Sequence, residues 1–232
     1  MACAVGQGNM RGLTPATLSE AQALQVALRE KVIIAPLRMP PAFIGAVDAS
    51  FMRDAVVAVA CLYSFPSLKH REDARCTEAV RFPYVPGFLT FREGHAMIRA
   101  VRKFTTSPGV VLVDGHGIAH PKGIGIASHI GVVLGIPTIG CAKSRLVGNF
   151  DEPAAKKGSW RYLFFEGVPV GAVVRTRDNV KPVFVSPGHL TDIPSSVEVV
   201  MTCAGQYRIP EPLRRADRIS RKLSREDDVE AC

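Results

Sequence analysis

The sequence predicts a single α/β domain in which helices flank a mixed β-sheet. Three observations favour this class. The 232 residues suit one large domain that can bury a core without cross-links. With 47% hydrophobic and 22% charged residues, the composition excludes a disordered chain and a membrane bundle. Strand-like and helix-like segments alternate without a repeat or a flexible linker, so we expect one domain over residues 15–225, between a flexible N-terminus (1–14) and a tail (226–232).

The first half of this domain is predicted to contain a helix, a β-hairpin, a third strand and a second helix. Leucines recur at helical spacing after Thr14, a predicted N-cap. Apolar runs that begin at Phe43 and Ala55 flank a short turn and predict the hairpin. A third strand is expected near residues 75–81, and the apolar spacing over Gly94–Phe104 predicts the second helix.

The second half is predicted to begin with a βαβ unit. GVVLVDGHG has the uninterrupted apolar run of a strand buried on both faces, residues 123–135 suit a buried helix, and IPTIGCAK has the pattern of the next strand. This order implies a parallel pair. Two antiparallel strands over Trp160–Glu166 and Val168–Arg175 are expected to follow, with a turn before KPVFVSPGH. A helix capped by Thr191 or Asp192, and a last helix that ends near residue 223, complete the domain.

The charge balance favours an anionic partner. Lys plus Arg number 29 and Asp plus Glu number 21, so the net charge is +8, which suits nucleic acid but also an ordinary soluble protein. The six cysteines contain no CxxC pair, which argues against a structural zinc site or a disulfide framework and favours a reducing compartment. The sequence shows no secretory signal and no apolar run long enough to span a membrane, so a cytoplasmic protein is expected.

Two aspartates directly follow apolar strands: Asp48 ends FIGAVD and Asp114 ends VVLVD. A carboxylate at the end of a buried strand needs compensation, and Mg²⁺ or Mn²⁺ bound to carboxylate oxygen is one compensator. For either residue alone, a turn or helix-cap role is the alternative. Glu93 suits a helix N-terminus. Asp217 lies on the flank of the apolar stripe of the last helix, where a salt bridge to arginine is the alternative.

Five segments resemble the signature blocks of the endonuclease V family, the deoxyinosine 3′-endonucleases. They are PYVPGFLTFRE, VLVDGHGIAHPKGIGIASHIG, IPTIGCAKSRL, KPVFVSPGH and RIPEPLRRAD. They occur in the order typical of the family, and the resemblance covers residues from about 43 to 225. One departure is VDASF at the first strand, where the family often has VDVSY or VDVSF. We expect this change to alter packing beside Asp48 and not the metal chemistry.

The resemblance implies an RNase H-like fold, Mg²⁺ as the cofactor with Mn²⁺ as a substitute, and recognition of deaminated adenine (hypoxanthine). It also implies that the strand is nicked at the second phosphodiester bond on the 3′ side of the lesion. Prokaryotic members are associated with DNA repair, whereas eukaryotic members prefer inosine in RNA. The short DGHGIAHP form and the compact length are more like the prokaryotic type, so deoxyinosine-containing DNA is favoured over RNA. We expect a monomer.

Residue by residue, the resemblance assigns a metal site. Asp48 and Asp114 match the carboxylates that bind the metal directly, Glu93 matches the third acid, and Asp217 occupies a fourth position that varies in the family. With the two polar residues that match positions beside the scissile phosphate, the implied catalytic residues are Asp48, Glu93, Asp114, Asp217, Lys143 and His120. Divalent cations suit such a cluster, because carboxylates alone would repel a phosphate that is already anionic.

The resemblance also assigns a substrate site. Tyr84, between two prolines, matches the aromatic wedge that separates the strands and stacks in the gap left by a flipped base. The remaining implied substrate-binding residues lie in the wedge segment and in the segments that line the base pocket: Pro86, Gly87, Leu89, Gly115, Gly125 and Leu146. The glycines of GHGIAHPKGIG allow backbone groups to approach the edge of an extruded base, or alternatively to hold a free phosphate.

Plainer roles remain open for several of these residues. Lys143 would supply a point charge to the phosphate, or be a solvated lysine. His120 would position water or contact a phosphate, or be a hydrogen-bonded loop histidine. Tyr84 could simply pack on the domain surface. The segment from Arg208 to Arg225 has seven basic and two acidic residues, which suits either a helix that follows the phosphate backbone or a solvated helix face.

Three other functions stay open. An endonuclease for inosine-containing RNA shares the same motifs. A protein that binds inosine without cutting has little need for the acids at 48, 93 and 114. A small-molecule enzyme that uses the Gly-rich loop for a nucleotide lacks the expected phosphate motif. The sequence therefore favours a metal-dependent, inosine-specific endonuclease.

Overall fold

The computed structural model describes residues 14–38 and 40–229, and residues 1–13 of the predicted flexible N-terminus lie outside them. Its strands are Phe43–Met52 (β1), Ala55–Ser64 (β2), His70–Ala79 (β3), Val110–Val113 (β4), Thr138–Ala142 (β5), Trp160–Phe165 (β6), Val168–Val174 (β7) and Val183–His189 (β8). Its helices are Leu18–Arg29 (α1), Leu89–Arg102 (α2), Ile126–Leu134 (α3), Ile193–Thr202 (α4) and Glu211–Val229 (α5).

All of these strands form one mixed sheet, in the order β3-β2-β1-β4-β5-β8-β7-β6. β4 pairs in parallel with both β1 and β5, and the other neighbours are antiparallel. The predicted α/β class, the β1–β2 hairpin and the parallel β4–β5 pair around α3 are therefore confirmed. The carboxyl ends of the parallel strands β4 and β5 meet at one edge of the sheet. Because β1 continues to Met52, Asp48 lies inside this strand, one residue past its pairing with β4, and the predicted strand end at Asp48 is wrong.

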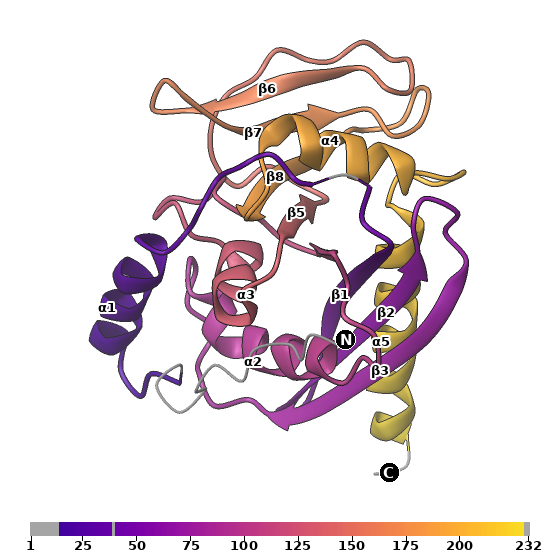
Figure 1. Cartoon of the computed structure of the whole chain (residues 1–232). Coiled ribbons are helices and arrows are strands. Elements are labelled where there is room, and N and C mark those ends of the chain that lie inside the picture. The colour runs from indigo at the N-terminus through magenta and orange to yellow at the C-terminus, as the bar shows by residue number, and fades with distance from the viewer. Residues whose placement is uncertain (1–13, 39, 230–232) are drawn as a thin grey trace.

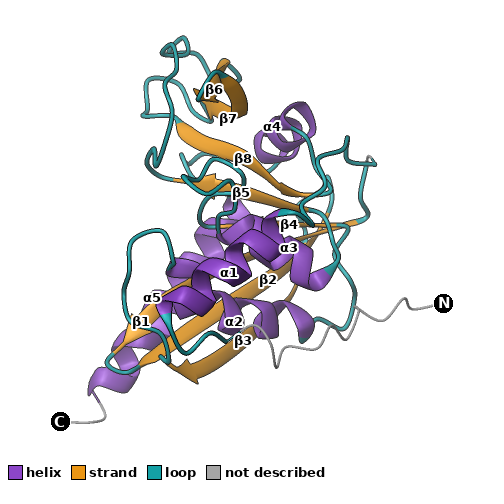
Figure 2. Cartoon of the chain, turned by 90° about the vertical axis from the view of Figure 1, so that its left-hand side faces the viewer, coloured by secondary structure: helices purple, strands orange, loops and turns teal. Residues whose placement is uncertain are grey.

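The sheet separates two cores. α4 and α5 cover one face, with Ala46 and Leu112 among the strand residues beneath them. α2 and α3 cover the other face, over Val47 and Val113. Alternate residues of a strand point to opposite faces, which is why neighbours in sequence belong to different cores. Figures 1 and 2 show α5 on the far side of β1 and β2 from α2, and α1 outside the layer formed by α2 and α3.

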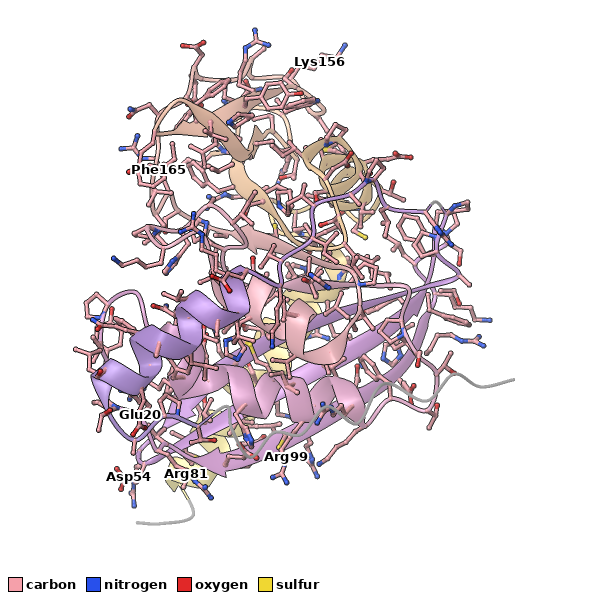
Figure 3. The ribbon with its side chains drawn as sticks, turned by 60° about the vertical axis from the view of Figure 1, so that its left-hand side comes forward. Glu20, Asp54, Arg81, Arg99, Lys156 and Phe165 are labelled. Atoms are coloured by element: carbon pink, nitrogen blue, oxygen red, sulfur yellow. The ribbon has the colours of Figure 1, made fainter. Side chains whose placement is uncertain are left out.

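The two edge strands lie toward opposite ends of the molecule. In Figure 3, Lys156 and Phe165 mark the β6 end, whereas Asp54 marks the β1–β2 turn at the other end. No helix in the described part of the chain combines the length and apolarity needed to cross a bilayer.

Two helix starts differ in detail from the prediction. Thr17, not Thr14, caps α1, because Thr17 has extended backbone angles and its hydroxyl accepts the N–H of Glu20 over 3.2 Å. At α4 the cap is Asp192, whose carboxylate accepts the N–H of Ser195 over 2.8 Å. Of the two predicted caps for that helix, the second is therefore the one used.

Three further element boundaries differ from the prediction. α2 begins at Leu89 instead of Gly94, because its first turn buries Phe91 beneath α1. β3 begins at His70, earlier than predicted. The prediction missed its first half because charged residues are common on edge strands and give no hydrophobic pattern. α5 continues to Val229, so the residues predicted to begin a tail at 226 are helical.

Candidate active site

Strand register brings Asp48 and Asp114 together. Val47 of β1 pairs with Val113 of β4, and the N–H of Asp114 donates to the carbonyl oxygen of Val47 over 3.1 Å. The next residue of each strand is therefore an aspartate. Ala46, two residues before Asp48, packs in the core beneath α5. Both carboxylates thus project toward the face that α5 covers.

The third carboxylate of the cluster comes from α5. Leu213 and Ala216 are buried against the sheet, which places Asp217 at the edge of the contact. Each of Asp48, Asp114 and Asp217 offers a carboxylate oxygen, and these oxygens all lie within 4.8 Å of one another. Hard divalent cations prefer carboxylate oxygen, so this cluster could hold a metal ion.

Lys143, which follows β5, contacts two of these acids. Its Nζ lies 2.6 Å from Asp114 Oδ2 and 2.9 Å from Asp217 Oδ1. Burial would lower the pKa of Lys143, but the two aspartates raise it above its ordinary value, so the side chain stays cationic. The guanidinium of Arg208 donates to the carbonyl oxygen of Lys143, and to that of Pro182 over 2.8 Å, which fixes the backbone that presents the lysine.

Asp217 also forms a salt bridge to an arginine, which was the alternative role predicted for it. Its Oδ1 lies 3.0 Å from the guanidinium of Arg221, one turn further along α5. The pairing with Arg221 therefore occurs together with the place in the acid cluster. The sequence already indicates this pairing, because residues four apart on a helix are neighbours on its surface.

The carboxyl group of Asp48 resists ionisation in this arrangement. Burial, followed by the charge of Asp114, raises the pKa of Asp48 to about 7, although Lys143 opposes the rise. Oγ of Ser220 lies 3.4 Å from Asp48 Oδ2 and 2.9 Å from Oγ of Ser50. Acids crowded in this way favour a bound cation, which would offset their mutual repulsion. Ser220 was not predicted as a site residue, although helical spacing placed it on the inward stripe of α5.

Glu93 approaches the cluster from α2, on the other face of the sheet. Its side chain is buried, with 6% of the residue exposed. Burial, followed by the charges of Asp48 and Asp114, raises the pKa of Glu93 to about 8. The cluster therefore acts on Glu93 electrostatically, but Glu93 is not among the three acids whose oxygens lie within 4.8 Å. Its part in metal binding stays a prediction.

The segment PYVPG leaves its aromatic residue in solvent, since Tyr84 is 68% exposed. Phe82, just before the segment, is buried, and Gly87 ends it with a left-handed φ of +82°. Pro86 and Leu89 are exposed beside it. An exposed aromatic on a stiff loop is compatible with the predicted wedge, and also with an ordinary surface tyrosine.

The Gly-rich loop after β4 folds tightly on itself. Its first residue, Gly115, has φ of +150°, which disfavours a side chain. The N–H of Gly125 donates to the carbonyl oxygen of Gly117 over 2.8 Å, and a Cβ on Gly125 would lie 2.3 Å from the carbonyl oxygen of His116. The amide of Gly125 is therefore engaged inside the loop. Leu146, assigned to the same pocket, is exposed beyond Lys143.

His120 is buried within that loop. Its Nδ1 accepts the N–H of Lys122 over 3.1 Å. Burial, followed by the neighbouring His116, lowers the pKa of His120 to about 4, so the imidazole is neutral at pH 7. The structure thus shows a hydrogen-bonded loop histidine, and the predicted contact with the phosphate stays a prediction.

Comparison with known proteins identifies the protein family of this chain. The family profile described as Endonuclease V matches residues 26–218. The chain belongs to the endonuclease V family. The resemblance seen in the sequence is confirmed, and family membership makes the chain a nuclease of the hydrolase class.

Relatives agree in sequence and in fold. The endonuclease V of Geotalea uraniireducens is 46% identical over 208 residues, which cover 90% of this chain and 89% of that relative. The crystal structure of endonuclease V from Streptomyces avermitilis has a TM-score of 0.88 and 39% identity, covering 93% of this chain and 96% of that one. The Ciona intestinalis endonuclease V, solved with a 24mer DNA containing an inosine followed by a ribo-adenosine, has a TM-score of 0.77 and 25% identity, covering 90% of this chain and 98% of that one.

Proposed function

We propose that this endonuclease recognises inosine in nucleic acid and hydrolyses the second phosphodiester bond 3′ to the lesion. Deoxyinosine-containing DNA is the favoured substrate, in DNA repair, and Mg²⁺ is the cofactor, with Mn²⁺ as a substitute. The observation that supports this most directly is the group of three carboxylates within 4.8 Å, in a chain of this family. The inosine-containing DNA bound by the Ciona relative supports the choice of lesion. The cytoplasmic location and the monomeric state stay predictions.

The acids would hold the ion from both faces of the sheet. Asp48 in β1 and Asp114 after β4 are side by side, Asp217 lies beside them on α5, and Glu93 completes the site from α2. A bound divalent cation supplies Lewis-acid stabilisation of the negative charge that builds on the phosphate and on the leaving oxygen. Without the ion, burial and the neighbouring acids raise the pKa of Glu93 to about 8, and a bound cation would favour its ionised form.

Lys143 would act on the scissile phosphate. In the structure its ammonium group is shared between Asp114 and Asp217, at the edge of the cluster. A cation at that position places a point charge beside an anionic phosphate that approaches the acids. Arg208 fixes the backbone of Lys143, so the lysine needs only a side-chain rotation to move from carboxylate to phosphate.

The test uses end-labelled DNA and RNA strands that each contain a single inosine, incubated with Mg²⁺, with Mn²⁺ or with a chelator. We expect the DNA strand to be cut once, at the second bond 3′ to the inosine, only when Mg²⁺ or Mn²⁺ is present. The product length reports the cut position, and the RNA strand reports the substrate class. A matched strand with adenosine in place of inosine is the control. Strands that are bound but left intact with both Mg²⁺ and Mn²⁺ would favour the non-cutting binding protein.

A further inference from the structure

α1 buries a polar side chain that the proposed chemistry does not use. Gln25 is 5% exposed and lies on the same helix face as Ala21 and Leu28. A buried amide needs a hydrogen-bond partner, and its Nε2 donates to the carbonyl oxygen of Gly87 over 2.8 Å. This contact joins residues 62 positions apart in the sequence. It ties α1 to the last residue of the PYVPG segment.

The same glycine also contacts the Gly-rich loop. The imidazole of His120 lies beside the backbone of Gly87, which opposes the fall in the pKa of His120. Because Nδ1 of His120 already accepts the N–H of Lys122, its other ring nitrogen is the one left to face Gly87. The backbone of Gly87 therefore connects α1, the Tyr84 segment and the loop that follows Asp114.

Apolar contacts hold both ends of the Tyr84 segment beneath α1. Phe82 and Phe91 form a small core with Ala21, and Phe88 packs against it. The ring centroids of Phe82 and Phe91 lie 5.7 Å apart, and those of Phe88 and Phe91 lie 6.2 Å apart. Both flanks are thus anchored while Tyr84 projects into solvent. A side chain that stacks on bases acts best from a rigid support, because a loose loop loses conformational entropy on binding.

We propose that Gln25 is a positioning residue for the wedge: by holding the carbonyl group of Gly87 it fixes the Tyr84 segment against the His120 loop. The inference rests on the proposed wedge role of Tyr84. α1 begins at Leu18, whereas the match to the family profile begins at residue 26, so most of this helix lies outside the matched region. The support for strand separation then comes from outside the core that holds the acids.

The test compares two identical substitutions on one helix. Methionine matches glutamine in length but has no N–H, so Gln25→Met removes the donor to Gly87 with little change in volume. Gln22→Met is the matched control, since Gln22 is exposed on the same helix. Each variant is assayed on one inosine strand, free and annealed in a duplex. We expect Gln25→Met to lower duplex cutting about tenfold with little effect on the free strand, because only the duplex needs a wedge.

A defect of folding alone would give a different pattern. It would lower cutting of the free strand and of the duplex together, and that outcome overturns the positioning role. Melting temperatures of both variants accompany the assays. Gln25→Asn keeps an amide but shortens the side chain, so it should reproduce the duplex-selective loss if Gln25→Met is too unstable to assay.

Tyr84→Ala, assayed in parallel, separates this inference from the proposed function. A duplex-selective loss in Tyr84→Ala but not in Gln25→Met overturns the role of Gln25 and keeps the wedge. Equal losses on both substrates in Tyr84→Ala would instead remove the wedge itself. Duplex-selective losses in both variants support the proposal.

Discussion

The acid cluster and the Tyr84 segment are supported in opposite ways. Asp48 lies in β1 and Asp114 follows β4, two neighbouring buried strands whose register fixes the separation of these acids, and Asp217 comes from a helix docked on the same sheet. Tyr84 projects from a loop held by a small aromatic core and by Gln25. The groups assigned to chemistry are therefore built into the main core, whereas the group assigned to recognition depends on a few local contacts. We expect substitutions in the first region to abolish cutting and those in the second to reduce selectivity by degrees.

The largest effect is expected for Asp114→Asn. The amide keeps the shape of the side chain but removes a negative charge from the acid cluster proposed to hold the metal, so cutting should fall about a thousandfold or more while binding of an inosine strand changes little. An end-labelled strand with Mg²⁺ measures cutting, and fluorescence anisotropy measures binding. Asp54→Asn, at the exposed β1–β2 turn, is the control. Full activity of Asp114→Asn would remove its assignment as a metal ligand.

A smaller effect is expected for Tyr84→Ala. Loss of an aromatic stacking surface is worth about 1–3 kcal/mol, so the preference for inosine over adenosine should fall about tenfold. The salt-dependent background binding should change less, since it depends on basic residues. Competition between inosine and adenosine duplexes measures the preference. Tyr162→Ala, which removes an exposed tyrosine on β6, is the control. An unchanged preference in Tyr84→Ala would contradict the wedge.

Arg215→Met tests whether the position of α5 matters to the cluster. Arg215 lies two residues before Asp217 on α5. Its Nε and Nη2 contact the carboxylate of Asp73 on β3, at 3.0 Å and 2.5 Å. Both side chains are 28% exposed, so we expect a loss of about 1 kcal/mol of stability. A shift of α5 should also raise the Mg²⁺ concentration needed for cutting by a few fold.

Urea unfolding measures the stability of Arg215→Met, and a Mg²⁺ titration of cutting measures the effect on the site. Arg218→Met, an exposed arginine on the same helix, is the control. Lower stability with an unchanged Mg²⁺ requirement would show that the ion pair does not position Asp217.

The smallest effect concerns pH. The pKa of Asp48 rises from 3.8 to about 7, and that of Glu93 from 4.5 to about 8. Because both are raised in the folded state, the native protein binds these protons more tightly than the unfolded chain. The free energy of unfolding should therefore fall as pH rises from about 4 to about 8.

Urea unfolding in the presence of a chelator, at several pH values in that window, measures this fall. Asp48→Asn should flatten it, because the amide has no proton to lose. Added Mg²⁺ should flatten it as well, since a bound cation favours the ionised acids. A steeper fall in Asp48→Asn than in the unchanged protein would contradict the raised pKa.

Local patterns predicted most of the fold because they depend on neighbours in sequence. The apolar runs before Asp48 and Asp114 indicated strands, and an acid directly after each run indicated a site, although β1 in fact continues past Asp48. Hydrogen bonds between residues far apart in sequence leave no pattern in the local sequence. Gln25 looks like one more polar residue of α1 until Gly87 is placed against it. Arg208 likewise looks like part of a basic segment until its guanidinium meets the backbone of Lys143.

The sequence by itself determined the α/β class, the family and the acids available for chemistry, because these follow from composition, periodicity and contiguous motifs. Only the tertiary structure decided which acids meet. Asp217 joins Asp48 and Asp114 because α5 docks on the face to which both of these carboxylates point. Glu93 lies outside this closest group because α2 packs on the opposite face. The face on which a helix docks depends on contacts across the whole sheet, which no local stretch of sequence contains.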